Sequence, residues 1–294
     1  MKITPLAAES MGSRSMATCV ETKECKVLID PGANVGSLRF GLSPHPLEKW
    51  LLQKHRERIA SYTQLSDIVI ITHYHFDHFT PDAYDLYKNK ILFLKNPNQK
   101  INVRQRNRAF EFLKNIKGLP SEISYVDGRA LDVGKTRFVF SEPILHGAVE
   151  RMGFVIQVAL KEDEETFLFS SDIQGPCRKA PVDFILRINP DFIYLDGPVT
   201  YLHDASGSRE TLNKTVTRII SILEKTKVTK VIIDHHLLRD LHWREKIQPV
   251  FAFANPKGII IQTASEFRGE ENNLLEARRR QLYESDLPER ANSA

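Results

Sequence analysis

The chain has 294 residues and a formal net charge of +4, with 41% hydrophobic and 27% charged residues. These fractions are close to those of ordinary globular proteins and exclude a collagenous or disordered chain. No apolar run approaches the ~18 residues that indicate a membrane-spanning helix, and the N-terminus has no secretory h-region. The three cysteines form no zinc-knuckle pattern. We therefore expect a reduced, cytoplasmic protein without a membrane partner.

The first third of the chain predicts strands that end at turns. The apolar run 26–29 stops at Asp30-Pro31-Gly32, and a helical pattern over 47–59 follows two prolines. The continuous apolar run 67–71 is typical of a strand buried on both faces. Thr80-Pro81-Asp82 offers the cap, the first-turn proline and the early acid of a short helix.

A strand at 91–94 and a helix over 102–117 come next. We assign to the apolar stripe of this helix the side chains of Val103, Phe110, Leu113 and Ile116. His45, between two prolines, and His55, in a charged helix, are interpreted as surface residues.

The rest of the chain first adds strands and then alternates helices with strands. We predict strands at 136–140, 154–160, 166–169, 192–195, 228–233 and 259–261, and helices at 181–188, 208–225, 243–253 and 270–283. No linker-like stretch separates the halves. We therefore predict one domain over 1–287, with two sheets in a sandwich and helices on both outer faces, and a frayed polar tail at 288–294.

The strongest chemical signal lies directly after the strand 67–71. His73-Tyr74-His75-Phe76-Asp77-His78 places four metal-ligand side chains in six positions, although the chain has only ten histidines. In an extended or turning segment, residues two apart point the same way, so His73 and His75 can converge on one ion. Asp77 and His78 follow the turn and can face a second ion. Imidazole and carboxylate together suit zinc, iron or manganese.

This motif resembles the His-x-His-x-Asp-His signature of the metallo-β-lactamase fold superfamily, and the resemblance extends over nearly the whole chain. It implies an αββα sandwich of two mixed β-sheets, with the site at one edge between them. The texture at 196–198 and 234–240 resembles, more weakly, a branch of the superfamily found chiefly in archaea, and that branch implies no substrate.

Further motifs follow in the order that the superfamily implies. Asp30 matches the aspartate that supports the metal loop from behind, His146 the third-motif histidine, and Asp172 the aspartate that bridges two metals. The fifth-motif histidine is His235 or His236, depending on where the preceding strand ends. We favour His235 as the ligand, which leaves His236 as a proton donor or a substrate contact.

The resemblance implies a metal-dependent hydrolase. Two divalent transition-metal ions, zinc first and manganese or iron as alternatives, would share Asp172 and a bridging water and make that water a hydroxide near pH 7. Asp77 could ligate one ion and also orient the hydroxide. The same chemistry cleaves phosphoesters, lactones, thioesters and amides, so the ligands do not identify the bond.

Three features give hints about the substrate. The segment 95–117 carries seven basic residues, Arg104 and Arg108 among them, against one acid, Glu111. A helix with a cationic face could attract a small anionic substrate such as a phosphoester or phosphodiester, although a solvated basic face is the alternative. Tyr201 and His203 follow another strand and are candidate substrate contacts. Nucleic acid stays open as a partner, but no aromatic interleaving supports it.

Two other classes of protein compete with the hydrolase. A redox di-iron protein on the same fold would need a flavin partner or domain, and nothing after residue 200 resembles one. A non-catalytic binding protein would be expected to have lost ligands, whereas all five motif positions are filled here. Oligomeric state is not indicated by the sequence.

Overall fold

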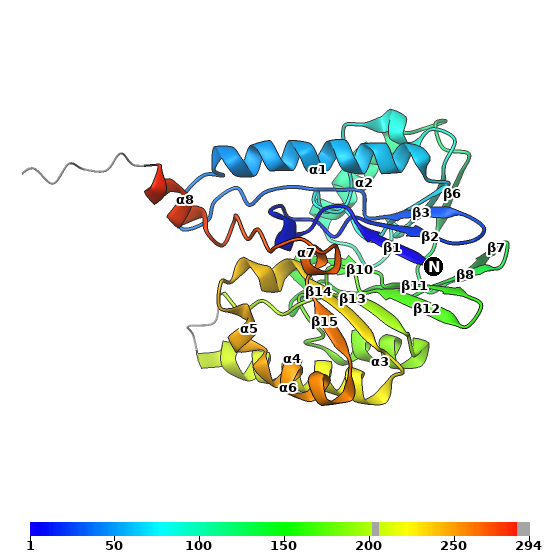
Figure 1. The fold of residues 1–294 in the computed structure, drawn as a ribbon. Helices are drawn as coiled ribbons and strands as arrows, with labels where there is room; N and C mark the ends of the chain where they lie inside the picture. The colour runs from blue at the N-terminus through cyan, green and yellow to red at the C-terminus, as the bar shows by residue number, and fades with distance from the viewer. Residues whose placement is uncertain (202–205, 287–294) are drawn as a thin grey trace, which may run out of the picture.

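The computed structural model describes residues 1–201 and 206–286, the side chains of 206–208 excepted. Two mixed sheets lie face to face in the middle of the molecule (Figure 1). The first has the order β1-β2-β3-β4-β5-β6 and is parallel from β3 onward. Its strands are β1 (Lys2–Pro5), β2 (Thr18–Glu21), β3 (Lys26–Ile29), β4 (Ile68–Ile71), β5 (Ile91–Leu94) and β6 (Glu122–Tyr125).

The second sheet has the order β15-β14-β13-β12-β11-β8-β7, and β12 to β15 are parallel. Its strands are β7 (Ala130–Val133), β8 (Thr136–Phe140), β11 (Val158–Glu162), β12 (Glu165–Phe169), β13 (Phe192–Asp196), β14 (Lys230–Asp234) and β15 (Ile260–Gln262). A two-stranded ladder of β9 (Ile144–Leu145) and β10 (Phe154–Val155) stands beside it.

Helices cover the outer face of each sheet (Figure 1). The helices α1 (Pro46–Leu65) and α2 (Val103–Asn115) pack on the first sheet, and α3 (Lys179–Ile188), α4 (Ser206–Lys225) and α6 (Gln248–Ala254) pack on the second. Shorter elements are α5 (Trp243–Lys246), α7 (Ala264–Phe267), α8 (Arg279–Ser285) and the 3₁₀ turns η1 (Glu9–Met11), η2 (Tyr84–Tyr87), η3 (Glu150–Met152), η4 (His235–Arg239) and η5 (Asn255–Lys257). No helix among the described residues is long and apolar enough to cross a membrane.

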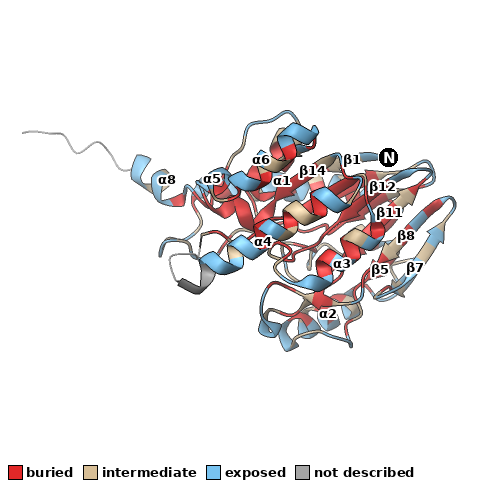
Figure 2. Cartoon of the chain, turned by 90° about the horizontal axis from the view of Figure 1, so that it is seen from below, coloured by how far each residue is buried: buried red, intermediate tan, exposed pale blue. Residues whose placement is uncertain are grey.

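Three apolar cores separate these four layers. Within β4, Ile68 and Ile70 point into the core between the sheets, whereas Val69 and Ile71 point into the core under α1 and α2. This alternation explains the continuous apolar run, because each face of a strand in a covered sheet meets another layer. Figure 2 shows the same principle in α3 and α4, which are buried on one side and exposed on the other. The predicted αββα sandwich is therefore confirmed.

Several predicted elements differ in the structure. The buried stripe of α2 is Gln105, Ala109 and Phe112, continued by Ile116, so Val103 and Phe110 are exposed and their assignment was wrong. The predicted helix at 270–283 is present only as α8. No helix begins at Thr80, whose hydroxyl donates to the carbonyl oxygen of Pro31; the first helical turn after it is η2.

Candidate metal centre

The sequence motifs meet at one edge of the sandwich, where the parallel strands of both sheets end. The loop after β4 carries the histidine motif, the loop after β12 carries Asp172, and β14 is followed directly by His235 and His236. A hydrogen bond of 2.6 Å between the hydroxyl groups of Thr72 and Ser171 joins the first two loops across the two sheets. Ends of parallel strands form such crevices because their loops all emerge on the same side.

Asp172 lies at the centre of this cluster and is buried. One nitrogen of each of six imidazole rings lies 3.1 to 3.9 Å from one of its carboxylate oxygens. The six rings belong to His73, His75, His78, His146, His235 and His236. Burial raises the pKa of Asp172, but the neighbouring imidazole rings, His146 foremost, outweigh burial and hold that pKa well below its usual value.

The spacing of these atoms fits shared metal ions. The rings of His73, His78 and His235 stand 3.5 to 3.7 Å from Oδ2 of Asp172, too far for good hydrogen bonds. Two ligands that each lie ~2.0–2.2 Å from one ion can be separated by such a distance. Nε2 of His73, Nε2 of His78 and Oδ1 of Asp172 are buried without a hydrogen-bond partner among the described residues. Orphaned buried polar atoms of this kind require an explanation, and a cation supplies one.

Asp30 lies behind the cluster and contacts the loop that follows β4. Its carboxylate accepts hydrogen bonds from the backbone N–H and the hydroxyl of Thr72, and it lies 2.8 Å from Nδ1 of His78. This contact turns Nε2 of His78 toward Asp172. Burial lowers the pKa of His78, but Asp30 and Asp172 outweigh it and raise that pKa well above normal. Gly32 allows the loop after β3 to approach the histidine loop closely. A Cβ at this position would lie 2.3 Å from the backbone nitrogen of Phe79.

In contrast to His78, two rings of the cluster are kept by burial in the neutral form that binds metal. Burial lowers the pKa of His73 well below normal and that of His235 to about 4, so both imidazoles are neutral at physiological pH. His235 adopts a left-handed backbone with φ of 63°, which directs its Nε2 to within 3.9 Å of Asp77. Asp77, His78 and His235 thus form one group of three ligand atoms within 4.8 Å of one another.

His236, the next residue, turns to the other side of the cluster. Its Nδ1 lies 3.1 Å from both carboxylate oxygens of Asp196 and 3.2 Å from Asp172. Burial and Arg239 hold the pKa of His236 well below its usual value. A neutral ring with its Nδ1 proton toward Asp196 keeps a lone pair on Nε2, which suits contact with a substrate donor better than proton donation.

Sequence reasoning missed several contacts of the site. Asp196 is the last residue of an apolar strand, and Asp172 follows another such strand closely. An aspartate at the end of an apolar strand is therefore a sequence signal that could have indicated Asp196. Gln105 is fully buried, and its amide lies 3.4 Å from Nε2 of His75. Arg239 is buried in an ion pair with Glu9, whose carboxylate lies 3.6 Å from Nδ1 of His235. No local pattern connects Glu9 with a histidine so distant in the sequence.

A polar cleft of about 500 Å³ opens above the cluster. Asp77, His146, Asp172 and His236 line it, and so do Arg104 and Arg108, whose role as substrate contacts stays a prediction. Three further arginines that the sequence did not single out, Arg14, Arg151 and Arg239, also line it. A cleft of this volume accommodates a small organic substrate.

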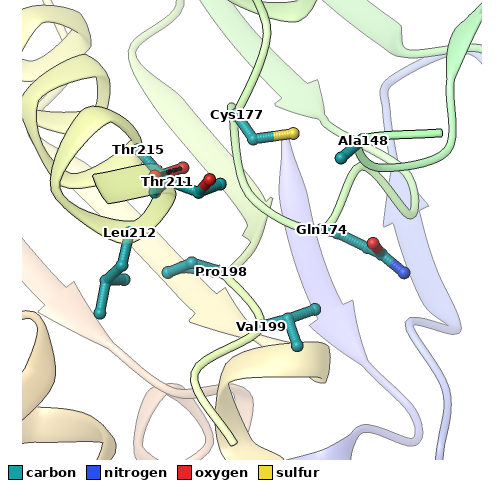
Figure 3. A pocket seen from close by; sticks show the side chains of 8 residues that line it. All are labelled: Ala148, Gln174, Cys177, Pro198, Val199, Thr211, Leu212 and Thr215. Carbon is teal, nitrogen blue, oxygen red and sulfur yellow. Dashed lines mark hydrogen bonds between the residues drawn. The ribbon is translucent and has the colours of Figure 1, made fainter. Parts of the chain in front are cut away.

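A second, smaller pocket lies beside the site, with a volume of about 120 Å³. Figure 3 shows its lining, which comes from α4 on one side and from the loops after β9, β12 and β13 on the other. Cys177, Pro198 and Leu212 are among the described residues that line it, and none of these described residues has a charged side chain. It is too small for an organic substrate, so the polar cleft is the place for one.

Of the two predicted substrate contacts beyond β13, one is not brought to the cleft and the other cannot be placed. Tyr201 is not among the described residues that line it; its ring stacks on the guanidinium of Arg39, 4.3 Å away. His203 lies outside the described residues. Both assignments stay predictions.

Comparison with solved structures defines the class of the fold. The chain is similar to the isothiocyanate hydrolase from Delia radicum gut bacteria, with a TM-score of 0.55, 19% identity, and coverage of 90% of this chain and 95% of that one. It is also similar to the metallo-β-lactamase fold protein YhfI from Bacillus subtilis, with a TM-score of 0.55, 13% identity, and coverage of 84% and 91%. The protein therefore has the metallo-β-lactamase fold.

Within that class the chain belongs to the UPF0282 protein family. It is 42% identical over 290 residues to a UPF0282 protein of Sulfurisphaera tokodaii, covering 97% of this chain and 94% of the relative. It is 40% identical over 285 residues to one of Korarchaeum cryptofilum, covering 97% and 95%. Both relatives are archaeal, which confirms the narrower resemblance. No family model matches the chain.

Proposed function

We propose that the protein is a metal-dependent hydrolase that holds two divalent transition-metal ions, zinc in the first place and manganese or iron as alternatives. His73, His75 and His146 would hold one ion, Asp77, His78 and His235 the other, and Asp172 would contribute to both. The observation that carries this proposal is the cluster of six imidazole rings around Asp172, in which the buried Nε2 atoms of His73 and His78 have no hydrogen-bond partner among the described residues.

The ions, when bound, would lower the pKa of a water molecule toward neutrality and stabilise negative charge that develops during hydrolysis. Around them, the side chains of the chain position the reactants. Asp77 lies at the base of the cleft, where its carboxylate can accept a hydrogen bond from the attacking water and so orient it. His236, held through Nδ1 by Asp196, faces the cleft and can contact the substrate.

The cleft favours an anionic substrate, with a phosphoester or phosphodiester ahead of a lactone or thioester. Five arginines line it, and the only two acidic side chains among its described lining residues are Asp77 and Asp172. The metal ions would neutralise the charges of these two aspartates. Guanidinium groups suit phosphate oxygens because their N–H groups form paired, charge-assisted hydrogen bonds. The similarity to an isothiocyanate hydrolase agrees with hydrolysis as the reaction class and leaves the bond open.

The substitution Asp172→Asn tests the proposal. It keeps the shape of the side chain but removes the charge that would offset the repulsion between two ions. We expect the wild-type protein to contain about two transition-metal ions per chain and the variant to lose at least one. Hydrolysis of the best substrate in a screen of phosphodiesters, lactones and thioesters should fall on the order of 10²-fold, equivalent to ~2.7 kcal/mol of transition-state stabilisation.

Asp132→Asn is the matched control, because Asp132 is an exposed carboxylate on the edge strand β7. It should leave metal content and hydrolysis unchanged. A wild-type chain that binds no transition metal, or an Asp172→Asn variant that keeps both ions and full activity, would contradict the proposal.

A further inference from the structure

The arginines of the cleft differ in how their charges are balanced. Arg14 makes two hydrogen bonds of 2.6 Å to the buried carboxylate of Glu276, and Arg239 pairs with buried Glu9. In the part of the chain that the structure describes, no ion pair involves Arg104, Arg108 or Arg151. The uncompensated positive charge of the cleft is therefore confined to the wall that these three residues form.

Hydrogen bonds between α2 and η3 build this wall. The side-chain amide of Asn102 donates to the carbonyl oxygen of Arg151 at 3.0 Å, and that of Gln105 donates to the carbonyl oxygen of Met152 at 3.4 Å. These two contacts tie the first turn of α2 to η3. They bring Arg104 and Arg151 to the same hollow of about 430 Å³, which Asn102, Val103 and Met152 also line.

Arg108 extends the wall toward the candidate metal centre. Its guanidinium donates to the carbonyl oxygen of Tyr74 at 3.2 Å and stacks on the ring of Phe76, 4.2 Å away. Both partners belong to the histidine motif, so the position of Arg108 is fixed relative to the ligands. The cationic wall therefore begins at the metal loop and ends at the hollow between Arg104 and Arg151.

We propose that this wall is a second anion site, in which Arg104 and Arg151 bind a phosphate group that the substrate carries away from the bond that is cleaved. The proposal rests on the proposed function only in placing the cleaved bond at the metal centre. The substrate is then an organic molecule with two separated anionic groups, one over His146 and Asp172 and one between α2 and η3. Two unpaired guanidinium groups match the double negative charge of a phosphomonoester.

Equilibrium binding tests this inference without any turnover. Isothermal titration calorimetry on the full chain as purified compares 1,3-propanediol bisphosphate with propyl phosphate, which differ by one phosphate group. The wild-type protein should bind the bisphosphate roughly tenfold or more tightly, because the second group adds contacts within one molecule. The double variant Arg104→Ala/Arg151→Ala should bind both ligands with similar affinity. The wild-type preference should weaken as salt is added.

The control variant Arg106→Ala/Lys114→Ala removes the same charge from exposed positions of α2 that do not line the cleft. It should keep the preference for the bisphosphate. Equal binding of the two ligands by the wild-type protein, a preference that survives in Arg104→Ala/Arg151→Ala, or one that is lost equally in the control would overturn the inference. A chain that shows the preference but holds no metal and hydrolyses no ester would overturn the proposed function instead.

Discussion

At the scale of single residues, the candidate site depends on carboxylates that fix the orientation of imidazole rings. Asp30 contacts Nδ1 of His78 and so directs its Nε2 into the cluster. Asp196 contacts Nδ1 of His236 and orients that ring in the same way. Partners of this kind set which ring nitrogen is free to bind. Their contribution to metal binding can therefore be measured separately from that of the ligands.

We expect Asp30→Asn to weaken metal binding about 10- to 100-fold, because the one amide oxygen cannot accept from both the backbone of Thr72 and Nδ1 of His78. The measurement is competition for zinc against a chromophoric chelator. Asp67→Asn is the control, since Asp67 lies just before the opposite end of β4 and accepts a backbone hydrogen bond from Lys26. It should cost some stability and leave zinc affinity unchanged. Equal zinc affinity in both variants and the wild type would contradict the supporting role of Asp30.

The part of the site that the sequence could predict is the part that is local or that ends a strand. His73, His75, Asp77 and His78 lie in one short loop, and their spacing alone indicates convergence. Glu9 and Arg14 could not be predicted, because they reach the site from the N-terminal segment through tertiary packing with η4 and the C-terminal region. Arg151 was missed because a single arginine in a loop carries no pattern.

At the scale of elements, α2 shows why an apolar pattern alone can select the wrong face. Val103 and Phe110 share one helical stripe, and Ala109, Phe112 and Ile116 share another. The second stripe begins with Gln105, a polar residue that argues against burial. The structure buries it because its amide contacts His75 and the carbonyl of Met152. The buried face of α2 thus departs from the apolar pattern at Gln105, the residue through which the helix contacts the site.

The helix α1 also buries a histidine that the sequence places at the surface. His55 is 2% exposed, and its Nδ1 lies 2.7 Å from the hydroxyl of Ser13. Burial, assisted by Arg58 and Arg268, lowers the pKa of His55 to about 4. The unfolded chain, with a normal histidine pKa of ~6.5, binds this proton first as the pH falls. The free energy of unfolding should therefore decrease between about pH 6.5 and pH 4.

We expect His55→Gln to remove this component of the pH dependence. The difference in unfolding free energy between wild type and variant should change by up to roughly 3 kcal/mol from pH 7 to pH 4, as measured by urea denaturation. His242→Gln, at an exposed histidine, serves as the control and should give a constant difference. Parallel curves for wild type and His55→Gln would show that His55 does not stay neutral in the folded protein.

At the scale of the whole molecule, the C-terminal segment joins the first half of the chain to the second. The backbone N–H of Asn273 donates to the carbonyl of Ser10, and Glu276 pairs with Arg14. The chain folds back over the start of α1 at Arg279, which explains why His45 is buried although the sequence predicts it at the surface. These contacts favour the single domain predicted over 1–287, because neither half completes its packing alone.

The substitution Arg279→Met tests whether the molecule unfolds as one unit. Arg279 is fully buried, and its guanidinium donates to both carboxylate oxygens of Glu48, at 2.7 and 2.8 Å, and to the carbonyl oxygens of Leu42 and Gly36. Methionine keeps much of the volume but leaves the buried charge of Glu48 without its partner. We therefore expect the free energy of unfolding to fall by about 3–5 kcal/mol.

The unfolding transition of the variant should remain a single step in both near- and far-ultraviolet circular dichroism, since the loss of stability affects the whole domain. Arg278→Met, at an exposed neighbour, should change the unfolding free energy by less than about 0.5 kcal/mol. If Arg279→Met instead splits the unfolding curve into two steps, the C-terminal segment and the first half of the chain form a unit that unfolds apart from the second sheet. If the variant is as stable as the wild type, the contact between Arg279 and Glu48 does not hold the two halves together.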